Sequence, residues 1–93
     1  MNLDGAYLKQ DHQKVMEHIR CIWNCNERML AAVVENDLEL AEKRAEDVLR
    51  SIRELKRLAE RKVLIDRRNQ LIQDLTKRGI TVEMVLKIYK EDE

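Results

Sequence analysis

Three side chains of the types that bind metal ions, His18, Cys21 and Cys25, lie at positions i, i+3 and i+7. On a helix this spacing places them on one face, where they would supply three ligands of a tetrahedral zinc ion. Structural zinc sites usually draw ligands from two segments, and this sequence has no second cluster. We therefore favour reduced thiols that pack as small apolar side chains over a metal site, and we predict no cofactor.

Nucleophilic catalysis has little support in the sequence. Ser51 is the only serine, His12 and His18 are distant from it along the chain, and no glycine-rich phosphate-binding loop is present. We expect a protein that is not an enzyme and that has no small-molecule substrate.

Basic side chains are concentrated in the second half of the chain. Residues 43–78 hold 12 basic and 6 acidic side chains, although the whole chain is balanced at 18 of each. Within this stretch we select Arg53, Lys56, Arg57 and Arg61 as candidates for electrostatic contact with an acidic partner or a DNA backbone. No aromatic residue interleaves them for base stacking, so any contact with DNA should be weak or indirect.

The elements that position these residues are predicted to be helices. With no proline and two glycines, the apolar spacing predicts a helix over about residues 8–35 and a long helix over about 38–78. Between them, Asn36 or Asp37 is suited to cap the second helix, at either a tight turn or a kink. Gly79 is a C′ residue after Lys77 and Arg78, and a short helix is expected over about 82–90. The sequence therefore predicts an all-α fold, a single helical oligomerisation domain over residues 1–93 that is coiled-coil-like or a helical bundle.

Two apolar seams are expected to form protein interfaces. The chain has only three aromatic residues to build a core, so we expect at least a homodimer, and a second helical protein as a further partner. A lone asparagine in the first seam would fix its register. The first seam comprises Ile19, Ile22, Asn26, Met29, Val33, Val48, Ile52 and Leu55, and the second comprises Leu71, Ile72, Leu75, Ile80, Val85 and Leu86.

The sequence predicts a soluble, cytoplasmic protein. Its formal net charge is zero, no apolar run approaches 18 residues, and the first residues do not resemble a signal peptide. Neither a membrane nor a nucleic acid is therefore favoured as the main partner.

Residues 67–80, with the sequence RRNQLIQDLTKRGI, resemble the second self-association site of the bacterial histone-like nucleoid-structuring (H-NS) family. Val85 and Leu86 follow at the place of that family's leucine pair, and Ile19-Arg20 resembles its N-terminal Ile-Arg. The resemblance covers most of residues 15–88. It departs near Val82, where the family has proline, and the printed chain does not extend to the family's DNA-binding domain.

The resemblance implies a truncated relative that holds the oligomerisation region only. It implies a dimerisation site around residues 19–52 and a head-to-tail site around residues 71–86. Such a chain would join the filament of a nucleoid-associated silencer by hetero-oligomerisation and so regulate transcription.

Two other functions stay open. A small helical chaperone or adaptor of a secretion or phage system would have a similar composition and would bind the amphipathic helix of one specific partner. The length and the Gly79 ending also loosely resemble the all-helical chorismate mutases. The first-helix arginine and lysine of that enzyme family have no match at the right spacing here.

Overall fold

The computed structural model describes residues 3–79 together with residues 83 and 87. These residues form a short 3-10 helix, η1 (Lys9–Asp11), and two α-helices, α1 (His12–Val34) and α2 (Leu38–Lys77), and no strand occurs among them. The predicted all-α class is confirmed. The short helix expected over 82–90 lies outside the described residues, apart from Glu83 and Lys87. Within the described part of the chain, no helix is both long enough and apolar enough to cross a membrane.

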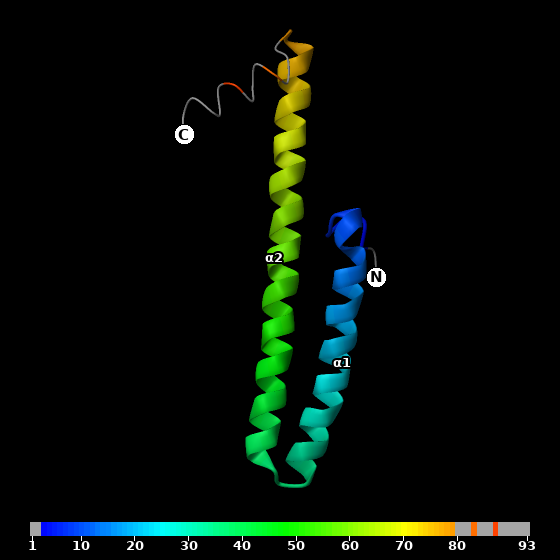
Figure 1. Ribbon diagram of the computed structural model, residues 1–93, viewed down its shortest axis with the longest axis vertical. Coiled ribbons are helices and arrows are strands. Elements are labelled where there is room, and N and C mark those ends of the chain that lie inside the picture. Colours follow the sequence, from blue (N-terminus) through cyan, green and yellow to red (C-terminus); the bar gives the residue numbers. More distant parts are fainter. Residues whose placement is uncertain (1–2, 80–82, 84–86, 88–93) are drawn as a thin grey trace. The chain divides into compact units, whose positions relative to one another are not determined.

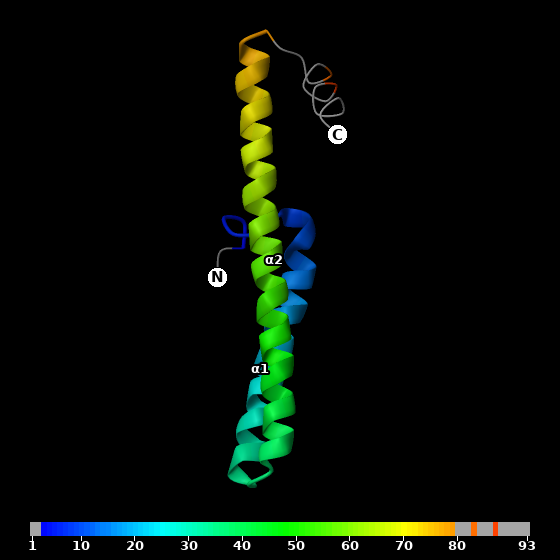
Figure 2. The ribbon, with the colours of Figure 1, turned by 90° about the vertical axis from the view of Figure 1, so that its left-hand side faces the viewer.

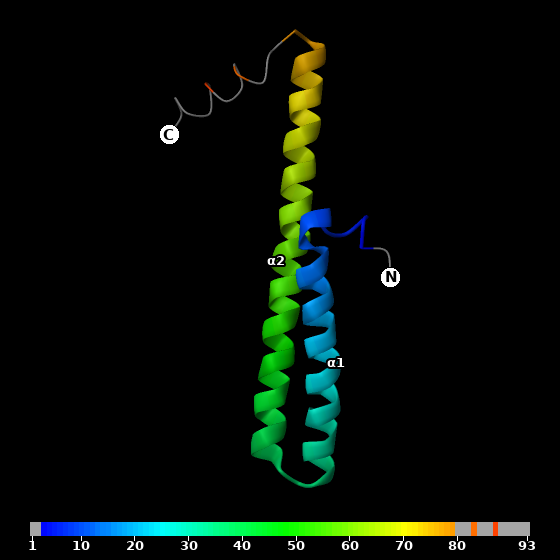
Figure 3. The ribbon, with the colours of Figure 1, turned by 45° about the vertical axis from the view of Figure 1, so that its right-hand side comes forward.

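The chain divides into two compact units, residues 1–62 and 63–93, which are described separately. In the first unit α1 and the beginning of α2 lie side by side and run in opposite directions (Figure 1 and Figure 3), and Figure 2 shows the same pair turned edge-on. The first unit is therefore an antiparallel helical hairpin.

The start of α1 lies later than the apolar spacing indicates. Leu8 has an extended backbone (φ −62°, ψ 143°), and Asp11 N–H donates to the Leu8 carbonyl at 2.9 Å to close the 3-10 turn. The α-helix begins only at His12, with Asp11 at its N-cap. An extended Leu8 cannot belong to a helix, so the apolar side chain at this position belongs to the segment before α1.

The hairpin reverses direction within three residues. Asn36 has a left-handed backbone (φ 61°), and its N–H donates to the Val33 carbonyl at 3.0 Å, while Asp37 N–H donates to the Ala32 carbonyl at 2.8 Å. These two hydrogen bonds are those of a Schellman motif. Asp37 then caps α2, because its Oδ1 accepts from Leu40 N–H at 3.2 Å. The interruption expected at residues 35–37 is a tight turn.

Inside the hairpin, each helix presents a seam of residues spaced alternately three and four apart. Few apolar side chains are fully buried among the described residues, and polar side chains occupy several seam positions. The buried apolar residues are Val15, Ala32, Ala41 and Leu58. The α1 seam is Asp11, Val15, His18, Ile22, Cys25, Met29 and Ala32, and the α2 seam is Ala41, Arg44, Val48, Ser51, Leu55, Leu58 and Lys62.

The second unit contains the last part of α2, residues 63–77. Gly79 has a left-handed φ of 87°, and its N–H donates to the Thr76 carbonyl at 3.0 Å. A glycine adopts this backbone without steric cost, so the helix ends where the sequence predicts a glycine C′ residue.

Candidate interaction surface

The first predicted seam is divided between the inside and the outside of the hairpin. Four of its members, Ile22, Met29, Val48 and Leu55, are half-buried at inner-seam positions, where one chain brings them together. The others alternate with them along the helices: Ile19 is half-buried, whereas Asn26, Val33 and Ile52 are exposed. On α1, the residue that faces α2 is in each case the one immediately before the predicted seam member. The inner seam therefore contains His18, Cys25 and Ala32 in place of Ile19, Asn26 and Val33.

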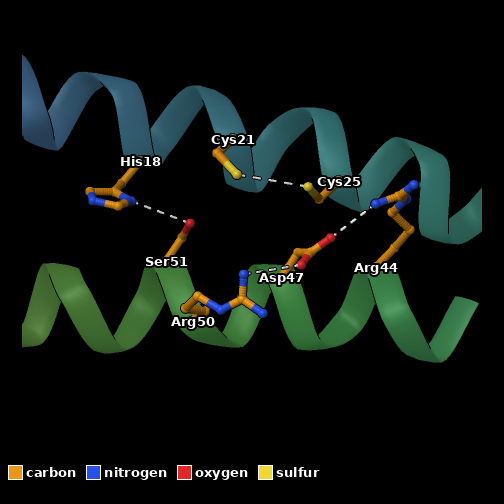
Figure 4. Close-up of polar contacts among 7 residues, drawn as sticks. All are labelled: His18, Cys21, Cys25, Arg44, Asp47, Arg50 and Ser51. Carbon is orange, nitrogen blue, oxygen red and sulfur yellow. Dashed lines mark hydrogen bonds and ion pairs between the residues drawn. The ribbon is translucent and has the colours of Figure 1, made fainter.

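A polar contact joins the two helices at the middle of the hairpin. His18 Nδ1 on α1 lies 3.3 Å from Ser51 Oγ on α2, and the two side chains point toward each other in Figure 4. Ser51 is buried, so this hydrogen bond gives its hydroxyl a partner within the chain. The hydrogen bond therefore joins two polar residues of the inner seam, which the apolar spacing of the sequence does not assign to an interface.

One edge of the hairpin is polar on both helices. An open pocket on this edge is lined by Lys14, Glu17 and His18 of α1 and by Arg50, Ser51 and Glu54 of α2. Nearby, Asp47 accepts from Arg44 Nη1 at 3.0 Å and lies 3.6 Å from Arg50 Nη1 (Figure 4). The pocket shows that these positions of α1 and α2 share one side of the hairpin, so the positions on the opposite side of each helix share the other edge.

The cysteine pair lies at the border of the polar edge. Cys21 Sγ and Cys25 Sγ are 3.8 Å apart on α1 (Figure 4), while His18 is turned toward Ser51. Partial burial raises the pKa of the Cys25 thiol above its usual range, and the hydrogen bond with Cys21 raises it further. A thiol kept protonated is a poor metal ligand and a poor nucleophile. In the described residues no group of three or more metal-binding side chains is arranged to hold an ion.

Two of the four cations selected for electrostatic contact have acidic neighbours within the chain. Arg57 donates to Glu54 through Nε at 3.0 Å and also through Nη2. This contact lowers the pKa of Glu54 and raises that of Arg57. Arg61 Nε lies 3.8 Å from Oδ2 of the buried Asp11. Arg53 and Lys56 are exposed on α2, and neither has an ion-pair partner among the described residues.

Opposite the polar edge, large apolar side chains from both helices are exposed. We name this surface the outer face. Trp23 and Leu30 of α1 are 69% and 54% exposed, although side chains of these types are usually buried. The outer face comprises Met16, Ile19, Trp23, Leu30 and Val33 on α1 and Leu38, Ala45, Leu49 and Ile52 on α2.

The spacing of the outer face explains why the two helices share it. Its α1 members recur at intervals of three, four and seven residues, with the exposed Asn26 between Trp23 and Leu30, and each lies one or four positions after an inner-seam residue. On α2, Ala45, Leu49 and Ile52 stand in the same relation to their own seam, Leu38 precedes that seam, and Glu42 lies between Leu38 and Ala45. In an antiparallel pair these equivalent positions lie along one edge, so the outer face is a mainly apolar surface over both helices, interrupted by Asn26 and Glu42. Apolar patches of this kind on soluble proteins mark interaction sites.

The second predicted seam is only partly described. Leu71 is 43% exposed, and Ile72 and Leu75 are half-buried, all on the last part of α2. Ile80, Val85 and Leu86 lie outside the described residues. The pairing expected between this seam and a second chain stays a prediction.

Comparison with known proteins identifies no relative of this chain. The chain matches no family model, no curated protein and no solved structure. The resemblance of residues 67–80 to the H-NS family therefore stays a prediction, and the outer face is interpreted from its own chemistry.

Proposed function

We propose that this protein is a non-enzymatic, helical interaction module that acts by pairing its outer face with helices of another protein chain. The observation that supports the proposal is the mainly apolar surface that α1 and α2 leave exposed. We place the module in the bacterial cytoplasm and expect it to pair with itself and with a second helical protein.

The packing of the hairpin favours association over an isolated existence. Among the described residues, only Val15, Ala32, Ala41 and Leu58 are fully buried apolar side chains, and two of these are alanines. Burying one large apolar side chain contributes roughly 1.5–3 kcal/mol. Covering the exposed Trp23, Leu30 and Leu49 of the outer face would therefore add substantially to the apolar burial of the hairpin.

The composition of the outer face is typical of a protein interface. Trp23 lies near its middle, and tryptophan is enriched among residues that dominate binding energy. Leucine, isoleucine and valine surround it, and the charged side chains lie mostly at its borders. This is the arrangement of an apolar centre with a polar rim.

The resemblance of residues 67–80 suggests the class of the second partner. We propose that it is a nucleoid-structuring silencer of the H-NS family, which the module would modulate by hetero-oligomerisation. The shared feature is a helix that ends at Gly79 after a leucine-rich stretch. Contact with DNA would then be indirect, through the partner.

The proposed function is tested by a pair of neighbouring substitutions. Leu30→Glu places a charge on the outer face, whereas Ala31→Glu places one on an exposed position that faces away from it. Association is measured by sedimentation velocity, for the chain alone and for a mixture with a purified H-NS-family protein. We expect Leu30→Glu to weaken association and Ala31→Glu to leave it unchanged. Equal effects of both, with helicity retained, would contradict an interaction through the outer face.

A further inference from the structure

Within each helix, the charges that border the outer face change sign at its middle. On α2, Glu42 and Lys56 lie seven residues before and after Leu49, while Glu46 precedes it by three residues and Arg53 follows it by four. On α1, Arg20 precedes Trp23 by three residues and Glu27 follows it by four. These six charged side chains are exposed, and none of them forms an ion pair with a residue of the described part of the chain.

The middle of the outer face lies at the same level on the two helices of the hairpin. Trp23 and Leu49 are each thirteen residues from Asn36, the central residue of the turn. His18 and Ser51, which are in contact, lie eighteen and fifteen residues from Asn36, so the two helices are level to within one helical turn. One axis perpendicular to both helices can therefore pass close to Trp23 and Leu49 together.

We infer that the outer face binds a second copy of this chain in the opposite direction, about a twofold axis through the Trp23 and Leu49 level. The inference rests on the proposed function, because it names the partner of the same face. Rotation about this axis lays α1 over α1 and α2 over α2, each pair antiparallel, and the product is a four-helix bundle.

Apolar side chains at the axis and near it match in this arrangement. Trp23 and Leu49 lie at the axis and face their own counterparts, while Met16 faces Leu30 of the second copy, because both are seven residues from Trp23. Ile52, three residues after Leu49, lies within one residue of the level of Ala45 of the second copy, which is four residues before its own Leu49. Large and small side chains thus alternate across the α2 pair, which favours close packing.

The charges match as well. Glu42 and Lys56 are each seven residues from Leu49, so Glu42 of one copy faces Lys56 of the second copy, and the pair occurs twice. Glu46 similarly approaches Arg53 of the second copy. Opposite charges at these places orient two surfaces that meet.

The alternative twofold arrangement, with both turns at the same end, lacks this match. It lays α2 of one copy over α1 of the other, so that residues at the same level meet. Glu42 would then face Leu30 and Lys56 would face Met16. Charges placed against apolar side chains lose hydration without gaining a partner. The sequence of charges therefore favours the antiparallel arrangement.

A charge-swap experiment tests the pairing. Glu42→Lys alone and Lys56→Glu alone each give a homodimer with two like-charge pairs, whereas a mixture of the two variants gives a heterodimer with two opposite-charge pairs. We expect each variant to self-associate at least about tenfold more weakly than the parent at low ionic strength, and the equimolar mixture to regain the parent's affinity. Lys43→Glu, an exposed neighbour outside the outer face, is the control and should leave the dimer unchanged.

Sedimentation equilibrium gives the dissociation constants, and the emission of Trp23, the only tryptophan, reports burial at the axis. Circular dichroism confirms that each variant is folded. A mixture no tighter than its components, or a dimer in which Trp23 stays exposed to water, would overturn the inference. A monomer that still binds an H-NS-family protein through Leu30 would overturn it and leave the proposed function standing. A folded chain that associates with neither would contradict both.

Discussion

Arg61 lies beside the buried carboxylate of Asp11, and replacing Arg61 tests how far that carboxylate depends on this cation. The Asp11 side chain is at the start of α1, and the residue is only 2% exposed. Its Oδ2 accepts no hydrogen bond from the described residues, and Arg61 Nε lies 3.8 Å away. Replacing Arg61 by leucine keeps much of the side-chain bulk and removes the charge. The carboxylate would then be buried without its ion-pair partner, and Arg57, which also interacts with Asp11, would be the remaining cation.

The expected cost follows from the distance and the exposure. At 3.8 Å, an effective dielectric constant of about 20 gives an attraction of roughly 4 kcal/mol. Arg61 is 39% exposed, so water screens part of this attraction, and its own hydration is recovered when the pair is broken. We expect Arg61→Leu to lower the free energy of unfolding by about 1–2 kcal/mol. For a chain of this size that corresponds to a fall in Tm of about 4–8 °C per kcal/mol.

Urea unfolding at one fixed protein concentration, followed by circular dichroism, measures this loss. Asp11→Asn removes the buried charge, so the double variant should be more stable than the sum of the two single losses predicts. Lys43→Leu, at an exposed position with no ion-pair partner among the described residues, should change stability by less than about 0.5 kcal/mol. A stability of Arg61→Leu equal to that of the parent would refute the reasoning and leave Arg61 available for a partner.

Three further predictions concern the inner packing, the turn and the polar edge. Leu58 is 0% exposed, so Leu58→Ala should cost about 2–5 kcal/mol in urea unfolding. Leu64→Ala, at a 65% exposed leucine, should cost far less, and equal losses would contradict the packing. Asn36 has a left-handed φ of 61°, so Asn36→Ala should lower the free energy of unfolding by about 1 kcal/mol, a fall in Tm of about 4–8 °C. Asn36→Gly should not lower Tm, and equal Tm values for the two variants would argue against this turn. The hydrogen bond from Arg57 lowers the pKa of Glu54, so its stabilisation is present above the unfolded pKa and is lost as the pH falls through the folded pKa. The difference in unfolding free energy between the parent and Glu54→Gln should therefore disappear in acid, and a difference that persists there would exclude this cause.

Local chemistry made several features of the fold predictable. Helical apolar spacing without proline predicted an all-α chain, and the structure has helices at both main predicted places. Asp37 was one of two candidates for the cap of α2, and its Oδ1 accepts the capping hydrogen bond. Gly79 was expected at C′ and has the left-handed backbone of that position. Each of these features depends on residues only a few positions apart, which is why the sequence alone indicates them.

The turn at residues 35–37 was only half determined by the sequence. The interruption was visible, but a tight turn and a kink both stayed open because neither glycine nor proline occurs there. Asparagine also adopts the left-handed backbone, since its short side chain tolerates it, and Asn36 does so here. That signal was present in the sequence and was missed.

Only the tertiary structure decided which side of each helix faces inward. On α1, Ile19 and Val33 are more apolar than His18 and Ala32, so apolarity alone selected the former pair for the seam. Both sets follow the same spacing of three and four residues, and a stripe this wide does not identify its inner half. The tight turn fixes the rotation of α2 against α1, and the small Ala32 and Ala41 lie buried beside it.

The partner of Arg61 was likewise decided by the fold. Glu54 lies three residues before Arg57, so the sequence already offers that local pair, whereas Arg61 is indistinguishable from Arg53 as a cation available to another molecule. The hairpin brings Asp11 to within 3.8 Å of Arg61, fifty residues along the chain. A contact between residues so far apart depends on how the whole chain folds, so no local pattern could have shown it. The sequence therefore determined the helices and their ends, and the tertiary structure determined which side chains they bury, pair and leave exposed.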